Sequence, residues 1–221
     1  TYKDGRARFN AYLDDYAQLA SACLEMLQAR WRSEDLVFAE ELVEVMLAHF
    51  EDRDRGGFWF TSDDHEALID RPKVFADESM AAGNGVAAQA LVTLGHLLGE
   101  IRYLDAAART FRAGTAALAN YPDAMCSLLT ALRDELELPA QVILRGDDEI
   151  LAQWRARLDA DFDSRRRVYA IATDAGALPG LLAMCEARAE GVAYLCHGTE
   201  CSAPLASTEE LQEALASHTR A

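Results

Sequence analysis

Residues 86–98 constrain the fold more than any other part of the chain, because they are apolar around almost the whole circumference of a helix. A helix of this kind is buried on most sides, so other helices must surround it. Gly99 is its expected end. The neighbouring segments each carry one apolar stripe at helical spacing; they are residues 11–31, 33–50, 102–118 and 122–136. One apolar helix among amphipathic ones indicates an inner and an outer ring of helices.

The order along residues 1–138 is helical hairpin, long connection, helical hairpin and single helix. Ser33 is predicted to cap the second helix, and Pro122 to open the fifth. We therefore predict a mainly α fold that begins with a partial α/α toroid. An arc of five helices leaves its inner face open, because such helices need neighbours on both sides. We expect helices upstream of Thr1, or a second copy of the chain in a homo-oligomer, to cover that face.

Residues 139–221 follow a different pattern, in which strands alternate with helices. Strands are predicted at residues 141–145, 167–172 and 192–195. Asp147 or Asp148 is expected to cap a helix that runs to about residue 160, and a short helix is expected over residues 178–188. Ser207 or Thr208 caps the last helix. This alternation predicts a small α/β unit with a short parallel sheet.

Charge and composition exclude several classes of function. The net charge of −16 argues against binding to nucleic acid or to an anionic membrane. No apolar run reaches the length of a membrane span, and no signal peptide is visible. No glycine-rich fingerprint follows Gly146, which argues against nucleotide binding. No cofactor is expected. The odd number of cysteines is typical of reduced thiols in a cytoplasmic protein; they are Cys23, Cys126, Cys185, Cys196 and Cys201.

The long connection, residues 51–86, is the part of the chain to which we assign function. Connections of this length are uncommon in compact domains unless they do something. Its aromatic run at residues 58–61 is a strand candidate, and apolar character resumes at Ala67, Leu68 and Ile69. Together these predict a β-hairpin on the loop face of the helices.

Several motifs together resemble one protein family. They are LDDYA at 13–17, GGFWFTSDD at 56–64, EALIDRPK at 66–73, GNGVAA at 83–88 and AYLCHGTECSAP at 193–204. They are similar to the C-terminal portion of thioredoxin-domain proteins related to spermatogenesis-associated protein 20. The chain departs from that family at residues 80–85, where it reads Met-Ala-Ala-Gly-Asn-Gly in place of a run rich in hydroxyl residues.

The resemblance implies a toroid of the six-hairpin glycosidase and N-acylglucosamine 2-epimerase type, with a thioredoxin-like domain before Thr1. It implies a carbohydrate-like ligand, and for an enzyme it implies sugar isomerisation, epimerisation or glycoside hydrolysis. The alternative is a non-catalytic scaffold that recognises a protein client or partner for the thioredoxin-like domain.

The candidate catalytic residues are Asp14, Asp15 and His65. In six-hairpin toroids the pocket is lined by the ends of inner helices, where a carboxylate can bind sugar hydroxyls or act as acid or base. The alternative for Asp14 and Asp15 is a favourable interaction with their own helix N-terminus. His65 lies within Asp-Asp-His-Glu, whose alternatives are an acid/base or metal site and a solvated turn. Because that spacing matches no standard metal pattern, no metal site is predicted.

The candidate substrate-binding residues are aromatic, cationic or amide side chains near the same loops. Aromatic faces suit sugar stacking, although large aromatics also pack loops onto helices. Arg71 could clamp a carboxylate or phosphate, or form an internal salt bridge. Asn84 is either a ligand-binding residue or a cap for the apolar helix. The full set is Tyr16, Phe58, Trp59, Arg71, Asp77 and Asn84.

Cys196 and Cys201 enclose His-Gly-Thr-Glu directly after a predicted strand. The spacing is neither that of the two-residue redox motif nor that of a zinc knuckle. Two free thiols in a tight loop are the first interpretation, and a redox pair is the second.

Overall fold

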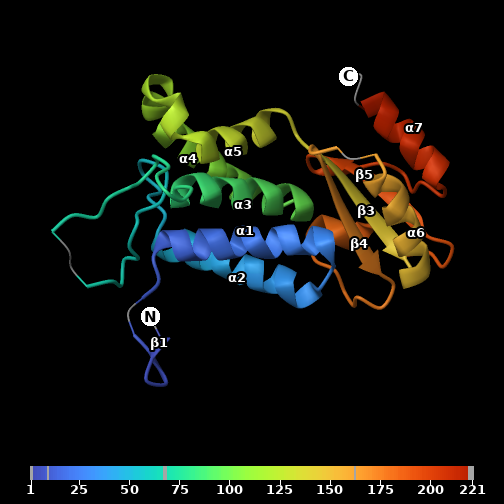
Figure 1. Cartoon of the computed structure of the whole chain (residues 1–221), viewed down its shortest axis with the longest axis horizontal. Coiled ribbons are helices and arrows are strands. Elements are labelled where there is room, and N and C mark those ends of the chain that lie inside the picture. Colours follow the sequence, from blue (N-terminus) through green and yellow to red (C-terminus); the bar gives the residue numbers. More distant parts are fainter. Residues whose placement is uncertain (1, 9, 67–68, 162, 219–221) are drawn as a thin grey trace.

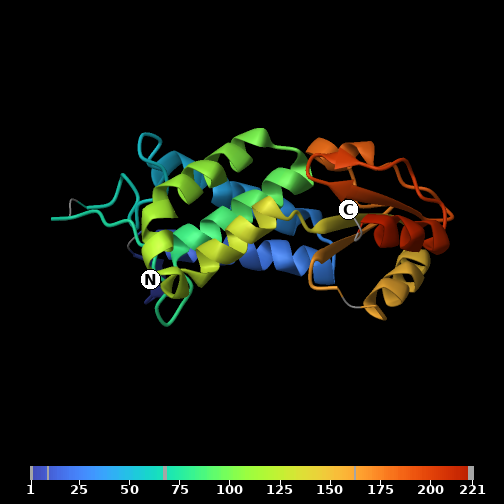
Figure 2. The same ribbon diagram turned by 90° about the horizontal axis from the view of Figure 1, so that it is seen from above.

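The computed structural model describes residues 2–8, 10–66, 69–161 and 163–218. The molecule is mainly helical, with a small mixed sheet at one end (Figure 1). Five helices make up the first part: α1 (Leu13–Ala29), α2 (Ser33–His49), α3 (Gly83–Leu98), α4 (Ile101–Asn120) and α5 (Cys126–Leu136). They are joined to the sheet along one long axis of the molecule (Figure 2).

Helix α3 is the centre of the helical part. It packs against α1, α4 and α5, and every residue in it except Gln89 is buried. Gly99 ends the helix in the left-handed conformation, with φ of 74°, which glycine adopts without steric penalty. The sequence prediction for this helix and for its end is therefore confirmed.

The predicted starts of α2 and α5 are wrong. Arg32, not Ser33, is the N-cap residue of α2. The Ser33 hydroxyl instead donates to the carbonyl of Ala175, 142 positions along the chain, so a tertiary contact takes the group that was expected to cap. Pro122 opens a separate 3-10 turn, η1 (Pro122–Ala124), before α5 begins at Cys126. A short N-terminal hairpin of β1 (Tyr2–Lys3) and β2 (Arg6–Ala7) precedes α1.

The β-hairpin predicted in the long connection does not form over the described residues. Residues 50–66 and 69–82 contain one isolated bridge, Glu51 to Phe58, and no strand. The two limbs do meet, since the Phe60 amide donates to the Pro72 carbonyl at 2.8 Å. The Phe58 amide and carbonyl bond to the Asn84 side chain, the Trp59 amide donates to the Phe50 carbonyl, and the Phe60 carbonyl accepts from the Leu13 amide. These groups are therefore not available for a ladder between the two limbs. Ala67 and Leu68, where the prediction placed the return strand, lie outside the described residues.

The sheet is mixed, so the prediction of a parallel sheet is wrong for one of its predicted strands. Its order is β4-β3-β5-β6, from β3 (Ala140–Gly146), β4 (Arg166–Ala172), β5 (Val192–His197) and β6 (Glu200–Cys201). β3 and β4 are parallel, as their α6 (Asp148–Asp159) crossover requires. β5 is antiparallel to β3 and starts opposite Arg145, at the end of the sheet where β4 stops. The connection from β4 to β5 holds only the 3-10 turn η2 (Gly180–Met184) and does not return to the other end of the sheet.

Both faces of the sheet are covered. On one face Ile143, Tyr169 and Ile171 join the apolar core of the helices. On the other face Val142 and Leu144 pack with α6 and with α7 (Thr208–His218) in a second cluster. Ser207 caps α7, as expected, by accepting from the Glu210 amide at 3.1 Å. No helix in the described ranges is long and apolar enough to cross a bilayer.

Candidate functional site

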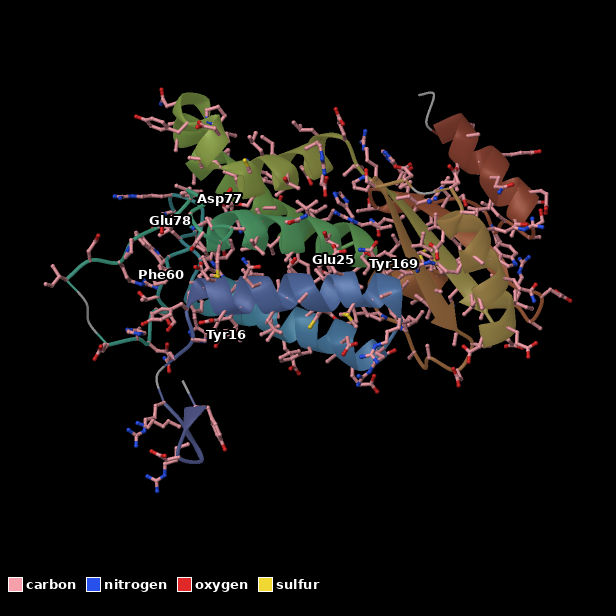
Figure 3. All side chains as sticks on the ribbon, in the orientation of Figure 1. Tyr16, Glu25, Phe60, Asp77, Glu78 and Tyr169 are labelled. Atoms are coloured by element: carbon pink, nitrogen blue, oxygen red, sulfur yellow. A yellow bond between two sulfur atoms is a disulfide. The ribbon has the colours of Figure 1, made fainter. Side chains whose placement is uncertain are left out.

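Helices α1, α3 and α5 start at the same end of the molecule, beside the long connection (Figure 1). The α1 residue Asp14 accepts a hydrogen bond from the backbone of Gly83, the first residue of α3. Asp77 ties the start of α3 to the start of α5. Tyr16, Phe60, Asp77 and Glu78 gather here, whereas Glu25 and Tyr169 mark the opposite, sheet-facing end (Figure 3). We call this end, with its loops, the loop-bearing end.

Asp77 is fully engaged by the two helices that it joins. Its carboxylate accepts from the Ala82 amide at 2.8 Å, from the Ser127 amide at 2.8 Å and from the Ser127 hydroxyl at 2.5 Å. Burial acts to raise the pKa of Asp77, but these hydrogen bonds outweigh it and the pKa lies below its ordinary value. Asp77 is therefore a helix clasp in this structure.

Close approach of the helices depends on two glycines. A Cβ at Gly83 would collide with the Asp14 carboxylate, and one at Gly85 with the Ser127 hydroxyl. The start of α3 can therefore lie directly against α1 and α5 only because these positions carry no side chain. The two glycines of the Gly-Asn-Gly sequence therefore serve helix packing.

Asn84 holds the long connection onto α3, and it does not cap the helix. Its buried side chain accepts from the Phe58 amide at 2.7 Å and donates to the carbonyls of Phe58 and Val74, both at 2.9 Å. Phe58 is completely buried. These contacts do not support the predicted ligand-binding roles of Asn84 and Phe58. The Asn84 amide already has partners within the chain, and the Phe58 ring is buried.

Arg71 and Lys73 of the long connection also have partners within the chain. Arg71 donates from Nη2 to the Thr61 carbonyl at 2.7 Å and to the His49 carbonyl at 3.3 Å. Lys73 pairs with Asp52 at 2.6 Å, and its Nζ lies 4.4 Å from the centroid of the Trp59 ring, while the Arg71 Cζ lies 5.5 Å from the same centroid. The Trp59 face is therefore in contact with two cations of its own chain.

The predicted catalytic residues have three different environments. Asp15 is exposed and accepts from the Tyr12 amide at 2.9 Å at the start of α1. It therefore interacts with its own helix N-terminus, which was the alternative to a catalytic role. His65 is half-buried; its Nδ1 lies 3.3 Å from the Glu66 carbonyl and its ring 5.8 Å from that of Tyr12. His65 makes no hydrogen bond to Asp14 or Asp15 within the described residues. The three do not form one acid–base constellation.

Asp14 is the predicted carboxylate with an electrostatically perturbed, half-buried position. Burial raises its pKa; the Gly83 backbone hydrogen bond opposes the rise, and the Asp15 charge adds to it. Within the described part of the chain no cation pairs with Asp14. Tyr16, two positions on, is half-buried, and its ring centroid lies 5.4 Å from that of Phe50. A carboxylate of raised pKa at a junction of helix starts has the properties of a proton-transfer group or of a hydroxyl acceptor.

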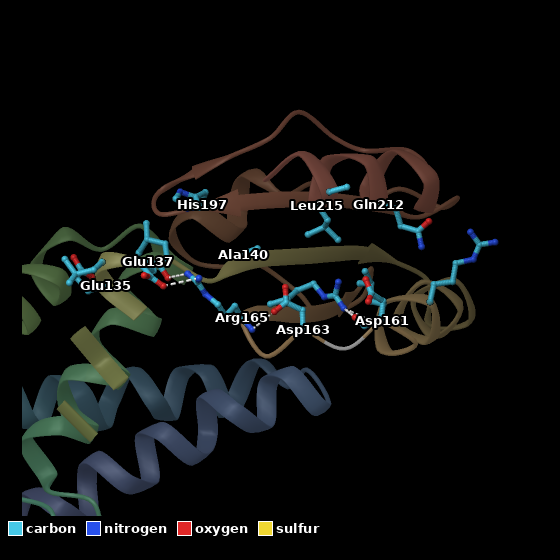
Figure 4. Close-up of a pocket in the computed structure, with 15 residues that line it drawn as sticks. Glu135, Glu137, Ala140, Asp161, Asp163, Arg165, His197, Gln212 and Leu215 are labelled. Atoms are coloured by element: carbon cyan, nitrogen blue, oxygen red, sulfur yellow. Dashed lines mark hydrogen bonds and ion pairs between the residues drawn. The ribbon is translucent and has the colours of Figure 1, made fainter. Parts of the chain in front are cut away.

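A cavity of about 870 Å³ lies elsewhere, between the end of α5 and the α/β unit (Figure 4). Its wall includes Glu137 and Arg165, which form an ion pair at 3.0 Å, and the Arg157 guanidinium, which pairs with Glu209 at 2.6 Å. These three charged groups of the wall therefore have partners within the chain. None of the residues that the sequence singled out as catalytic or substrate-binding lines the cavity.

The cysteine prediction is wrong for one pair. Cys196 and Cys201 are directly opposite on β5 and β6 and form a disulfide, with Cα atoms 3.9 Å apart. Cys23, Cys126 and Cys185 are free. A two-residue turn brings the pair together, a contact that linear spacing did not reveal.

Sequence reasoning also missed two buried arginines on the sheet. Arg167 pairs with Asp134 of α5 at 2.7 Å, with both side chains buried. Arg145 is buried on the same face without a carboxylate partner among the described residues. The available signal was alternation, because Arg145 shares the strand face of Ile143 and must point toward the helices.

No protein-family model matches the chain. The chain is similar to the uncharacterized protein B0495.5 of Caenorhabditis elegans, with 26% identity over 216 residues. The match covers 96% of this chain and 29% of the nematode protein, so the chain spans less than a third of that relative.

Proposed function

We propose that the chain is an arc of an α/α toroid and belongs to the C-terminal portion of a thioredoxin-domain protein related to spermatogenesis-associated protein 20. In this proposal the loop-bearing end binds a carbohydrate-like small molecule. The arrangement of α1, α3 and α5, which start together and lie side by side, supports it. Apolar side chains exposed on the two edge helices support it further: Leu19 and Met26 on α1, and Leu129 and Leu136 on α5.

These exposed side chains are what an incomplete ring requires. Leu19 and Met26 are seven positions apart on α1 and 45% and 43% exposed, and Leu136 at the end of α5 is 74% exposed. In the proposal, further helices cover both edges, since toroid helices need neighbours on both sides. The length of the nematode relative is compatible with such additional helices.

Asp14 carries the functional part of the proposal. It is half-buried, its pKa is raised, and no cation in the described residues neutralises it. These properties suit a group that accepts a sugar hydroxyl or transfers a proton. The reaction class to test is isomerisation, epimerisation or hydrolysis of a sugar, with Asp14 as acid or base and Tyr16 beside it.

The test is calorimetric titration of the full-length protein with a panel of mono- and oligosaccharides, followed by turnover assays on those that bind. We expect Asp14→Asn to lose binding or turnover at least tenfold. Asp15→Asn is the matched control, because Asp15 is adjacent in sequence but exposed and engaged at its own helix start. Absence of sugar binding, or equal activity of both variants, refutes the proposed role of Asp14.

A second candidate is a non-catalytic scaffold that binds a protein client or partner. The hydrogen bonds that Asn84, Asp77, Arg71 and Lys73 make within the chain favour it, because these groups then hold the structure together. It predicts no sugar binding, together with loss of partner binding when the exposed edges are altered, for example by Leu136→Glu.

A further inference from the structure

The sulfur atoms of three cysteines meet beside the sheet. Cys185 follows η2, Cys196 lies on β5 and Cys201 on β6, and their sulfur atoms lie within 4.8 Å of one another. Cys185 and Cys196 are each only 2% exposed, whereas Cys201 is partly exposed. The free thiol of Cys185 is thus held against the Cys196–Cys201 disulfide, and Cys201 is the partly exposed member of that disulfide.

A buried cation stands next to this cluster. Arg145 is 7% exposed, its Nε has no hydrogen-bond partner within the described residues, and its Nη1 reaches the Ala172 carbonyl at 3.4 Å. Burial lowers the pKa of Arg145, and the acidic groups of Cys185 and Tyr194 raise it. A buried guanidinium without an anion is unfavourable. An anionic sulfur in the cluster would give Arg145 the partner that it lacks.

We propose that Cys185, Cys196 and Cys201 form a thiol–disulfide exchange centre. A thiol compound starts the exchange at Cys201, and Cys185 then replaces Cys196 in the disulfide. Arg145 stabilises the Cys185 thiolate during its attack. Burial raises the pKa of Cys185 to about 11, so the resting group is a thiol, and Arg145 acts in the opposite direction. This inference is independent of the sugar-binding proposal.

The exchange needs no oxidant. An external thiolate attacks Cys201 Sγ, the Cys196–Cys201 bond breaks, and Cys196 leaves as a thiolate that takes up a proton. The Cys185 thiol loses its proton and attacks Cys201 Sγ of the mixed disulfide. A Cys185–Cys201 bond forms and the external thiolate departs. One disulfide and one free thiol are present in the cluster before and after, and the external thiol is regenerated.

A metal site is the weaker assignment for the same atoms. A structural zinc site takes four ligands with its cysteines deprotonated. The described residues offer three ligand atoms here, and two of them are bonded to each other. Metal binding is nevertheless a distinguishable outcome of the experiment.

Tryptic peptides separate the three cysteines in a useful way. Cleavage after Arg167 and Arg188 places Cys185 on peptide 168–188, and Cys196 with Cys201 on peptide 189–220. The full-length protein is incubated with a glutathione buffer, acid-quenched, alkylated with N-ethylmaleimide and mapped by mass spectrometry. The resting disulfide lies within one peptide, and exchange produces a cross-link between the two. We expect that cross-link in the parent protein and in Cys126→Ser, and its loss in Cys185→Ser.

The role of Arg145 is tested by the rate and the pH profile of cross-linking. The charged and titratable groups that interact with Cys185 are Arg145 from β3 and Tyr194 from β5, and the sulfur atoms of Cys196 and Cys201 lie beside it. Arg145→Gln should slow cross-linking about tenfold and move its pH midpoint upward by about one unit, with recovery in Arg145→Lys. A purely structural role would leave the midpoint in place.

Three results overturn the proposal. In the first, Cys185 is fully alkylated in the parent protein and no cross-link appears at any glutathione concentration. In the second, the reduced protein retains one zinc ion and all three cysteines resist alkylation, which assigns a metal site. In the third, Arg145→Gln exchanges with the parent's rate and midpoint, which removes Arg145 from the centre.

Discussion

Replacing Asn84 by alanine tests whether the long connection is held to the helices by one side chain. The substitution removes three hydrogen bonds, which join α3 to both limbs of the connection. It leaves the amide and the carbonyl of Phe58 without partners in a completely buried position. The Val74 carbonyl is less buried and can be hydrated.

The magnitude follows from the two groups left unsatisfied. A buried donor or acceptor without a partner costs about 1–3 kcal/mol, so the pair at Phe58 sets a loss of about 3 kcal/mol. Detachment of the connection does not avoid this loss, because it exposes the Phe58 ring, which costs about 2–3 kcal/mol. Both routes give a similar figure.

Urea unfolding and hydrogen exchange of the Phe58 amide measure the effect. We expect Asn84→Ala to lower the free energy of unfolding by about 3 kcal/mol and to speed exchange at Phe58. Asn120→Ala is the control, because Asn120 is exposed and makes one bond, to the Ala116 carbonyl, so its loss should stay within about 0.5 kcal/mol. A loss below about 1 kcal/mol in Asn84→Ala, with unchanged Phe58 exchange, would refute the clamp and leave Asn84 available for a ligand.

Three further predictions concern titratable groups. Tyr103→Phe should lower the free energy of unfolding by about 1–2 kcal/mol, because the buried Tyr103 hydroxyl donates to Glu44 at 2.5 Å. Tyr169→Phe should leave that free energy unchanged or raise it by up to about 1 kcal/mol, because the buried Tyr169 hydroxyl has no partner among the described residues. Thermal unfolding compares the two variants. The pKa of Asp77 is lowered, so its contribution to stability is present above the unfolded value and is lost as pH falls through the folded one. Asp77→Asn should therefore flatten the acid side of the stability profile, and an unchanged profile would contradict the clasp. The pKa of Asp14 is raised, so it opposes folding at neutral pH, and Asp14→Asn should raise the unfolding midpoint at pH 7 but not at pH 3.

Local sequence patterns were sufficient for the elements whose environment is set by burial. Residues 86–98 are apolar on all sides, and α3 is the central helix. The strand pattern at residues 141–145 gave β3, and the expected crossover helix gave its parallel pairing with β4. In these places hydrophobic period and capping chemistry agree with the tertiary structure.

Strand direction and the role of polar side chains depended on contacts that sequence spacing does not encode. β5 is antiparallel to β3 because the connection from β4 stays at the end of the sheet where β4 stops. No residue in that connection indicates the strand direction. Asn84 is a residue type common at helix caps, but it bonds to Phe58, 26 positions earlier, and holds the long connection onto α3. Cys196 and Cys201 pair because a turn places them opposite each other. For the candidate residues at the loop-bearing end, the sequence did not reveal which polar groups have partners within the chain.

An experimental structure of the full-length protein would test the proposed toroid arc directly. We expect further helices to pack on Leu19 and Met26 of α1 and on Leu129 and Leu136 of α5, with the Asp14 carboxylate lining a central cavity. Solvent on both apolar edges, or an Asp14 carboxylate covered by protein with no cavity in front of it, would rule the arc out.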